Sequence, residues 1–390
     1  MSSRIFLLLI FAAGSIAHAA VPGPKDLPDH PAMPDPLVAK DGSAVTTPDQ
    51  WAKRRMEMKQ ILEDYEFGHM PPPPGNVTGK LISSQVIQSG SASLLYRQVH
   101  LTFGPGQKLG FDLSIFSPFS PASVVEDKSV PGPNFPTIIH LTYRTGTNSL
   151  APYAEAFRRG YAVVQIDYKQ LGADALNFRQ TGFFPSYPDY DWNDFAAWAW
   201  GVSRAVDFLV TDPFTDKTKL IVAGVSRLAQ SAELAGAFDD RIALVAGVGC
   251  GCAFRFTGHG RGGKQGLDEV IDQNTYWFGP NLPQFYGQTD KLPFDQHWMV
   301  VLTAPRRFIL CNGLDDQYVN GNGVAQSYLA AKPTFAMLGV PEHLAQNFRP
   351  GPHGFQSADW LAILDFADQQ LLGKKIDRTF DQLPAADSLH

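Results

Sequence analysis

The hydrophobic and polar positions of this chain alternate in blocks from about residue 137 onward. Short continuous apolar runs, which are typical of strands covered on both faces, are separated by helical stretches. This alternation predicts a mostly parallel sheet flanked by helices, an α/β fold, and no second alternating block follows it. The strands are expected at residues 137–141, 161–166, 220–225, 242–248 and 307–310, and the helices at 151–159, 193–210, 227–238, 324–338 and 357–372.

The first third of the chain has a different pattern. Residues 21–48 are rich in Pro and Asp without apolar periodicity, so we expect an extended arm on the domain surface. A helix should follow from Trp51 through Ile61, until the glycine and proline residues after it end the helix. Two runs rich in β-formers, 93–103 and 109–116, flank a Gly-Pro-Gly turn and predict an antiparallel hairpin.

The first nineteen residues have the features of a secretory signal. Arg4 precedes an apolar run at 5–13, and Ala17-His18-Ala19 has the small-x-small pattern that a signal peptidase reads. The apolar run is shorter than a membrane span requires, and no later run reaches that length. We therefore expect a soluble exported protein, secreted or periplasmic, that begins near Ala20 and has no membrane partner.

Composition narrows the class of protein. Of 390 residues, 44% are hydrophobic and 18% are charged, which is too apolar for a disordered chain. A formal net charge of −6 disfavours the basic surface that nucleic-acid binding requires. The three cysteines are an odd number, and Cys250 and Cys252 are too close in sequence to bridge without strain, so no disulfide framework is expected. The predicted organisation is a signal at 1–19, an arm at 20–48 and one catalytic domain at 49–390.

The sharpest local signal for chemistry is the segment from Lys219 to Phe238. A buried strand ends in Gly224-Val225-Ser226 and a helix begins at once, which is the context that exposes a nucleophilic serine on a tight turn. Ser226 is therefore the candidate nucleophile, although an ordinary helix-capping serine would occupy the same place. The fifth position of the usual G-x-S-x-G motif is Leu228 here, a departure from the generic pattern.

A nucleophilic serine needs a base and an acid that orients the base. His353 lies in a Gly-Pro-His-Gly loop after the last predicted strand, where the base of a Ser…Asp/Glu…His order belongs. Asp315 and Asp316 follow the preceding predicted strand, and either could stabilise the charged form of His353. A turn with two solvated aspartates is the alternative interpretation of that pair.

Five blocks occur in a set order along the chain: 224–227, 235–244, 249–251, 292–306 and 350–360. In order and spacing they resemble the glucuronoyl esterases, a family of carbohydrate esterases, and the similarity extends from about Trp51 to Leu372. The resemblance implies an α/β-hydrolase fold and an exported enzyme. It further implies cleavage of the ester between 4-O-methyl-glucuronic acid on xylan and alcohols of lignin, with neither metal nor organic cofactor.

The resemblance also implies roles for single residues. Ser226 would be the nucleophile, His353 the base, and Arg227 an oxyanion stabiliser through its guanidinium and its N–H. Many members of the family carry a glutamate after the strand that follows the nucleophile helix, but residues 245–254 contain no carboxylate. Other, mainly bacterial, members carry an acid after the next strand, and the match with them favours Asp316 over Asp315.

Three further positions that the resemblance assigns to substrate binding carry changed residues. Gln230 matches a lysine that hydrogen-bonds sugar hydroxyls, and Gln265 falls near a glutamate that also contacts the sugar. A glutamine can donate and accept hydrogen bonds but lacks the charge-assisted contribution. Tyr318 stands in place of a pocket tryptophan and can still stack on a sugar face.

The expected function is a serine esterase that acts on a glucuronoxylan or lignin–carbohydrate ester by way of an acyl-enzyme, as a monomer without cofactor. Two alternatives remain. The chain could act on another carbohydrate or aryl ester, of the acetyl or feruloyl type, because Gln230 and Gln265 replace charged residues. It could also be a catalytically silent, hydrolase-like carbohydrate-binding protein.

Overall fold

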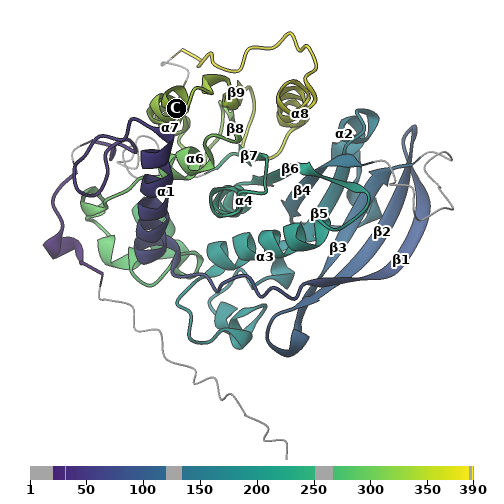
Figure 1. Ribbon diagram of the computed structural model, residues 1–390, viewed down its shortest axis with the longest axis horizontal. Coiled ribbons are helices and arrows are strands. Elements are labelled where there is room, and N and C mark those ends of the chain that lie inside the picture. Colours follow the sequence, from purple (N-terminus) through teal and green to yellow (C-terminus); the bar gives the residue numbers. More distant parts are fainter. Residues whose placement is uncertain (1–20, 31, 120–133, 251–266, 386–388, 390) are drawn as a thin grey trace, which may run out of the picture.

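A computed structural model describes residues 21–30, 32–119, 134–250, 267–385 and 389. Its centre is a sheet of nine strands in the order β1-β2-β3-β5-β4-β6-β7-β8-β9, which crosses the molecule from one side to the other (Figure 1). The strands are β1 (Thr78–Ser89), β2 (Ala92–Phe103), β3 (Leu109–Pro118), β4 (Phe135–Thr142), β5 (Ala162–Asp167), β6 (Thr215–Val225), β7 (Leu244–Val248), β8 (Arg307–Gly313) and β9 (Leu344–Arg349).

The sheet is parallel from β5 to β9 and antiparallel from β1 to β3, with β3 joined antiparallel to β5. The mostly parallel sheet and the hairpin predicted from the sequence are both confirmed. Two strands were not predicted, β1 and β9. Most of β1 is exposed, so it lacks the apolar alternation that marks a half-buried strand, and β9 is six residues long with Gln346 and Asn347 at its centre.

Helices cover both faces of the sheet and make three layers (Figure 1). Successive residues of one strand point to opposite layers, as Ile138 and Ile139 of β4 do, and each layer has its own apolar core. One face carries α2 (Ala154–Arg158) and α8 (Ser357–Leu372). The other carries α1 (Pro48–Leu62), α3 (Asp194–Leu209), α4 (Arg227–Phe238), α6 (His297–Thr303) and α7 (Gly321–Met337), and α5 (Leu267–Gln273) is short.

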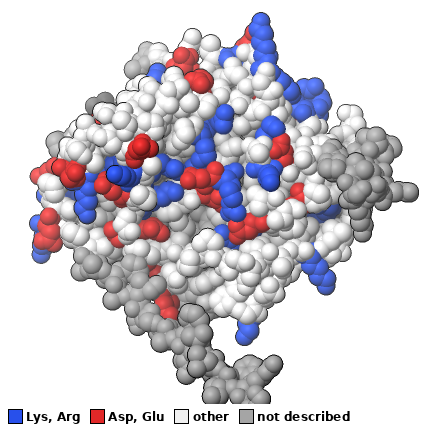
Figure 2. Space-filling view, viewed as in Figure 1, with Lys and Arg blue, Asp and Glu red and all other residues white. Residues whose placement is uncertain are grey.

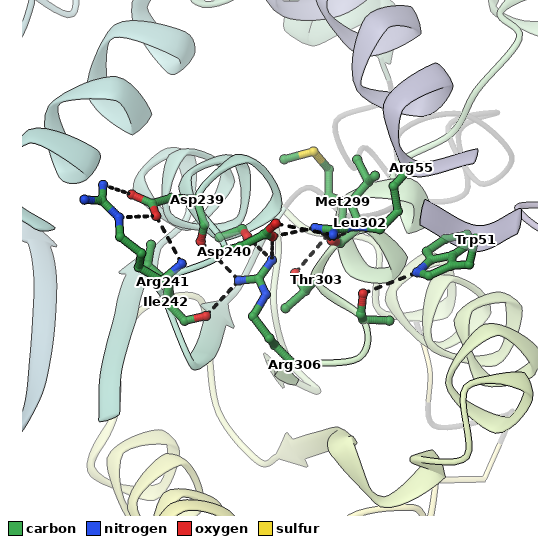
Figure 3. A network of polar contacts seen from close by, with 12 residues as sticks. Trp51, Arg55, Asp239, Asp240, Arg241, Ile242, Met299, Leu302, Thr303 and Arg306 are labelled. Carbon is green, nitrogen blue, oxygen red and sulfur yellow. Dashed lines mark hydrogen bonds and ion pairs between the residues drawn. The ribbon is translucent and has the colours of Figure 1, made fainter. Parts of the chain in front are cut away.

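The carboxyl end of α4 is fixed by a network of polar contacts, shown in Figure 3. Arg306, which lies between α6 and β8, donates to the backbone carbonyls of Gly236 and Ile242 at 2.6 and 2.7 Å. Asp240 accepts from Arg306 at 3.0 Å and from Arg55 of α1 at 2.6 Å. Because the last carbonyls of a helix have no partners within the helix, the contact with Gly236 satisfies a group that partial burial would otherwise leave unpaired.

The described residues before α1, 21–30 and 32–47, lie against α1 and α6 and form no long helix or strand of their own. They contain a turn at Pro24–Asp26 and a single bridge between Val38 and Ala44. Trp298 donates from its indole nitrogen to the carbonyl of Pro34 at 3.2 Å. The expected signal at 1–19 lies outside the described residues, and no described helix is both long and apolar enough to cross a membrane.

Candidate active site

The turn between β6 and α4 presents Ser226. This residue has a backbone φ of 59°, a conformation that residues other than glycine rarely adopt. Its N–H donates to the carbonyl of Val248 at 2.9 Å, which holds the turn against the end of β7. A Cβ on Gly224 would lie 2.3 Å from the carbonyl oxygen of Leu228, so the close approach of helix to strand requires glycine at 224. Leu228 itself is fully buried in the core, and the turn forms without glycine at that position.

His353 and Asp316 meet beside this turn. The Nδ1 of His353 lies 2.7 Å from Oδ2 of Asp316, and the other carboxylate oxygen accepts the N–H groups of Tyr318 and Val319 at 2.8 and 2.9 Å. Burial of Asp316 opposes its ionisation, but the hydrogen bonds from His353 and the two backbone amides outweigh that cost and lower its pKa below the ordinary value. The carboxylate is therefore charged and can stabilise a protonated His353.

Asp315 has a different position. Its side chain is exposed, and Oδ2 accepts the N–H of Gly351 at 2.7 Å. Gly351 lies two residues before His353, so Asp315 anchors the loop that carries the histidine. Of the two candidate acids, the structure brings Asp316 to the imidazole and Asp315 to the backbone of the loop.

The residue after β7 is Gly249, at the place where many relatives were expected to carry a glutamate. A Cβ built on Gly249 would lie 3.1 Å from the His353 ring and 3.5 Å from Oδ2 of Asp316. The end of β7 therefore faces the histidine, but it offers no carboxylate. Asp316 reaches the same imidazole from the loop after β8.

Ser226 and His353 line one cavity of about 570 Å³. Its walls include the aromatic side chains of Tyr143, Phe195, Trp277 and Tyr318. Of the described residues that line the cavity, Arg227 alone carries a permanent charge. The cavity thus combines aromatic and apolar side chains with a small set of polar groups, as sites for organic ligands usually do.

Arg227 is the first residue of α4, where helix geometry leaves the backbone N–H without an intrahelical partner. Its guanidinium lies at the cavity wall, and Nη1 donates to Oδ2 of Asp174 at 2.6 Å. Asp174 follows β5 in a loop, and Trp277 of the Thr275–Trp277 turn donates to its other oxygen at 2.7 Å. Sequence reasoning missed Asp174 and Trp277. The only available signal was an acid in the loop that follows a predicted parallel strand, at the edge of the sheet where sites form.

Gln230, in the second turn of α4, is 1% exposed at the cavity wall. Its amide nitrogen donates to Gln296 at 2.7 Å, and its oxygen accepts from the thiol of Cys250 at 3.5 Å. Gln296 also donates to Glu66, whose side chain is completely buried. Burial and, to a smaller extent, the negative charge of Asp295 raise the pKa of Glu66 to about 8, against the hydrogen bond from Gln296, which lowers it.

The remaining predicted positions are divided between described and undescribed residues. Tyr318 is 58% exposed, and its ring lies 5.2 Å from the His353 ring at the cavity. Gln265 lies outside the described residues, as does Cys252, while Cys250 and Cys311 are buried. Within the described ranges, no group of three or more His, Cys, Asp or Glu side chains is arranged to hold a metal ion.

The sequence profile of the family described as "Glucuronyl esterase, fungi" matches residues 117–339, more than half of the chain. The chain belongs to the glucuronoyl esterase family. The resemblance inferred from the sequence blocks is thereby confirmed.

Relatives of this family member cover nearly its whole length. A carbohydrate esterase from an unknown prokaryotic organism is 29% identical over 87% of this chain and 90% of its own length. A 4-O-methyl-glucuronoyl methylesterase of Schizophyllum commune is 27% identical over 96% of this chain and 92% of its own length. A solved glucuronoyl esterase of carbohydrate esterase family 15 from Caldicellulosiruptor kristjansonii has a TM-score of 0.77 and 27% identity, covering 92% of this chain and 96% of that one. The expected α/β-hydrolase fold is therefore confirmed.

Proposed function

We propose that this family member hydrolyses glucuronoyl esters, specifically the ester between (4-O-methyl-)glucuronic acid on xylan and a lignin-type alcohol. The observation that supports the assignment best is the arrangement of Ser226, His353 and Asp316. The serine lies on a strained turn, the base lies on the same cavity, and the base is bound at 2.7 Å by a buried charged carboxylate. This constellation is the one that activates a serine for acyl transfer.

The proposed reaction has two halves. Ser226 attacks the ester carbonyl while its proton passes to His353, and Asp316 stabilises the imidazolium that forms. The N–H of Arg227 and its guanidinium hold the negative oxygen of the tetrahedral intermediate. The alcohol leaves with the proton from His353, and water then attacks the acyl-enzyme by the same route in reverse to release the acid.

Substrate contacts are proposed at three positions. Tyr318 is exposed at the cavity and can stack on a sugar face. Gln265 is proposed to contact the sugar on the basis of the family resemblance alone. Gln230 forms part of the cavity wall, and because both ends of its carboxamide are bound by Gln296 and Cys250, we propose that it acts on the substrate mainly through the shape of that wall.

A second candidate is an esterase for other carbohydrate or aryl esters. It is favoured by the neutral Gln230 at a position where relatives were expected to carry lysine, and by the aromatic walls of the cavity. Rates on benzyl and methyl glucuronate, compared with rates on acetyl and feruloyl esters of xylan, separate the two candidates. A higher kcat/KM on the glucuronate esters supports the first, and a higher value on the other esters supports the second.

The test of the catalytic assignment is Ser226→Ala. We expect hydrolysis of benzyl glucuronate to fall by at least about a thousandfold with the fold unchanged. Ser231→Ala is the matched control, because Ser231 lies in the same helix, is fully buried, and has no hydrogen-bond partner for its hydroxyl in the described structure. Full activity of the Ser226 variant would contradict the assignment.

A fluorophosphonate probe distinguishes an active enzyme from a silent relative. We expect the probe to label wild-type protein and the Ser231 control, but not the Ser226 variant. Absence of labelling in folded wild-type protein would favour the silent carbohydrate-binding alternative.

We also infer, from the signal-like segment at residues 1–19, that the protein is exported, and we propose that it acts as a monomer. Protein recovered from the periplasm or the medium should begin near Ala20 and elute as a monomer, which intact mass and gel filtration measure. An uncleaved amino terminus on that protein would contradict the inference.

A further inference from the structure

Asp174 receives hydrogen bonds from three separate elements around the cavity. Its Oδ2 accepts from Nη1 of Arg227 at 2.6 Å and from the hydroxyl of Tyr168, directly after β5, at 3.3 Å. Its Oδ1 accepts from the indole N–H of Trp277 at 2.7 Å. The side chain is only 10% exposed, so these donors replace most of its contact with water. One carboxylate thus joins the loop after β5, the start of α4 and the Thr275–Trp277 turn.

The same carboxylate holds the guanidinium of Arg227 on its edge and, through Trp277, on its face. The Trp277 ring lies 5.0 Å from Cζ of Arg227, a distance at which a cation is attracted to an aromatic face. Because Asp174 binds Arg227 with one oxygen and Trp277 with the other, it sets the position of both partners in that contact. Arg227 directly follows Ser226, and both line the cavity.

A second carboxyl group nearby is uncharged. Asp194, at the start of α3, is fully buried, and neither of its oxygens has a hydrogen-bond partner among the described residues. Burial, followed by the negative charge of Asp174, raises the pKa of Asp194 to about 9. The negative charge that faces Arg227 from this side is therefore supplied by Asp174.

We propose that Asp174 is a positioning residue for the esterase reaction, which holds the Arg227 guanidinium and Trp277 in one arrangement at the wall beside Ser226. This inference rests on the proposed function. The guanidinium is held on its edge by Asp174 and on its face by Trp277 before the reaction starts. No free energy is then spent on ordering it when negative charge develops on the substrate oxygen. Such preorganised groups stabilise the transition state more than the bound substrate, so their loss lowers kcat more than it changes KM.

The test is Asp174→Asn. The amide can accept from Arg227 but cannot also accept from Trp277, and the negative charge is removed. We expect kcat on benzyl glucuronate to fall ten- to a hundredfold while KM changes less than about threefold. Asp174→Glu, which keeps the charge, should recover part of that loss. An unchanged kcat in folded Asp174→Asn protein overturns the proposal.

The chain offers a matched control in the pair of Arg97 and Asp212. Asp212 binds Arg97 with both oxygens at 2.6 and 2.8 Å, and the Phe214 ring lies 4.5 Å from the guanidinium carbon. This site also combines a buried Arg–Asp pair with an aromatic ring over the guanidinium, but here both carboxylate oxygens bind the arginine, and none of the three residues lines the cavity. Asp212→Asn should lower the melting temperature and leave kcat of the folded enzyme unchanged. An equal loss of kcat in both variants would mean that the Asp174 effect is a general effect of a broken ion pair, and would overturn the proposal.

A double-mutant cycle asks whether Asp174 acts through Arg227. We expect the loss from Asp174→Asn to shrink to less than about twofold in an Arg227→Ala background, because the group it positions is already absent. The full loss in that background overturns the proposal.

Should Asp174→Asn not fold, Trp277→Phe carries the test, since it keeps a ring and removes the N–H donor. It should lower kcat severalfold, and an unchanged kcat overturns the proposal. Full activity of Ser226→Ala would instead contradict the proposed function, so the two failures are distinguishable.

Discussion

The two ends of α4 carry charges that oppose the helix dipole, and the molecule compensates them in different ways. Arg227 places a positive charge at the amino end, where the dipole is also positive. Asp239 and Asp240 place negative charges just beyond the carboxyl end, where the dipole is negative. Each is stabilised by opposite charge from elsewhere in the chain: Arg227 by Asp174, Asp239 by Arg241, and Asp240 by Arg55 and Arg306.

The difference lies in what the compensation leaves available. At the carboxyl end, Arg306 donates to three backbone carbonyls and to Asp240, so its donors are used within the scaffold (Figure 3). At the amino end, Arg227 gives one nitrogen to Asp174 and remains 35% exposed at the cavity. The carboxyl end of α4 thus holds the helix in place. The amino end keeps the strained Ser226 and the charged Arg227 in contact with the cavity.

Charged side chains of both signs are mixed on the surface of the molecule. In Figure 2, Lys and Arg side chains lie interspersed with Asp and Glu side chains across the visible face, and no large area carries one sign alone. This distribution agrees with the small net charge of −6.

The largest effect is expected from a substitution that disrupts the proposed catalytic residues beside the amino end of α4 and leaves the helix intact. Asp316→Asn removes the charge that stabilises protonated His353, and we expect kcat to fall by about 10³–10⁴ with little change in melting temperature. Asp315→Asn is the control, because Asp315 binds the backbone of Gly351 instead, and its kcat should stay within about threefold of wild type. Steady-state kinetics of the two variants decide between the acids, and the reverse order of losses would show that Asp315 is the triad member.

The next largest effect is expected from a substitution that disrupts the network at the carboxyl end of α4 and leaves the cavity residues unchanged. Arg306→Met leaves the carbonyls of Gly236 and Ile242 without this donor in a partly buried place. We expect the free energy of unfolding to fall by about 2–4 kcal/mol, with kcat of the folded enzyme within about threefold of wild type. Urea denaturation and kinetics below the transition measure both quantities.

The exposed Arg158, which pairs with Glu155 on the surface of α2, is the control for that variant. Arg158→Met should have a much smaller effect on unfolding, because water screens an exposed pair. A large loss of kcat in folded Arg306→Met protein would show that the two ends of α4 are not independent.

The smallest effect concerns the middle of α4, where Gln230 meets Gln296 and Glu66. The pKa of Glu66 is raised from 4.5 to about 8, so the folded chain keeps a proton that the unfolded chain loses above pH 4.5. The free energy of unfolding should therefore decrease as pH rises from 5 to 8, by on the order of 1–3 kcal/mol from this group. Glu66→Gln cannot ionise and should show a flatter dependence in urea denaturation across that range. Identical slopes in both proteins would show that Glu66 titrates normally.

Much of the scaffold follows from local pattern, and much of the site does not. The bounds of α4 and α8 were predicted to the residue, because a strand end and a glycine-rich loop mark where each begins. The strand β1 has no buried face to mark it. By position alone the sequence leaves Asp315 and Asp316 equivalent. The family resemblance favours Asp316, and the fold shows that the carboxylate of Asp316 turns toward His353 while that of Asp315 binds the loop backbone.

Asp174 shows the other limit of sequence reasoning. It lies 52 residues before Ser226 in numbering and belongs to no motif, yet its carboxylate contacts Arg227, the residue after that serine. The contact exists because parallel strands end at one edge of the sheet and place their loops side by side. Such a partner becomes visible only when the strand order is known.

The packing of Gly224 against the carbonyl of Leu228 has a practical consequence for finding and redesigning such enzymes. The glycine before the serine is the one that geometry demands, because any side chain there would collide with the helix backbone. The position two residues after the serine accepts a leucine whose side chain fills the core. A search pattern that insists on the second glycine would pass over this chain, and a designer who needs an extra side chain at the elbow can place it there.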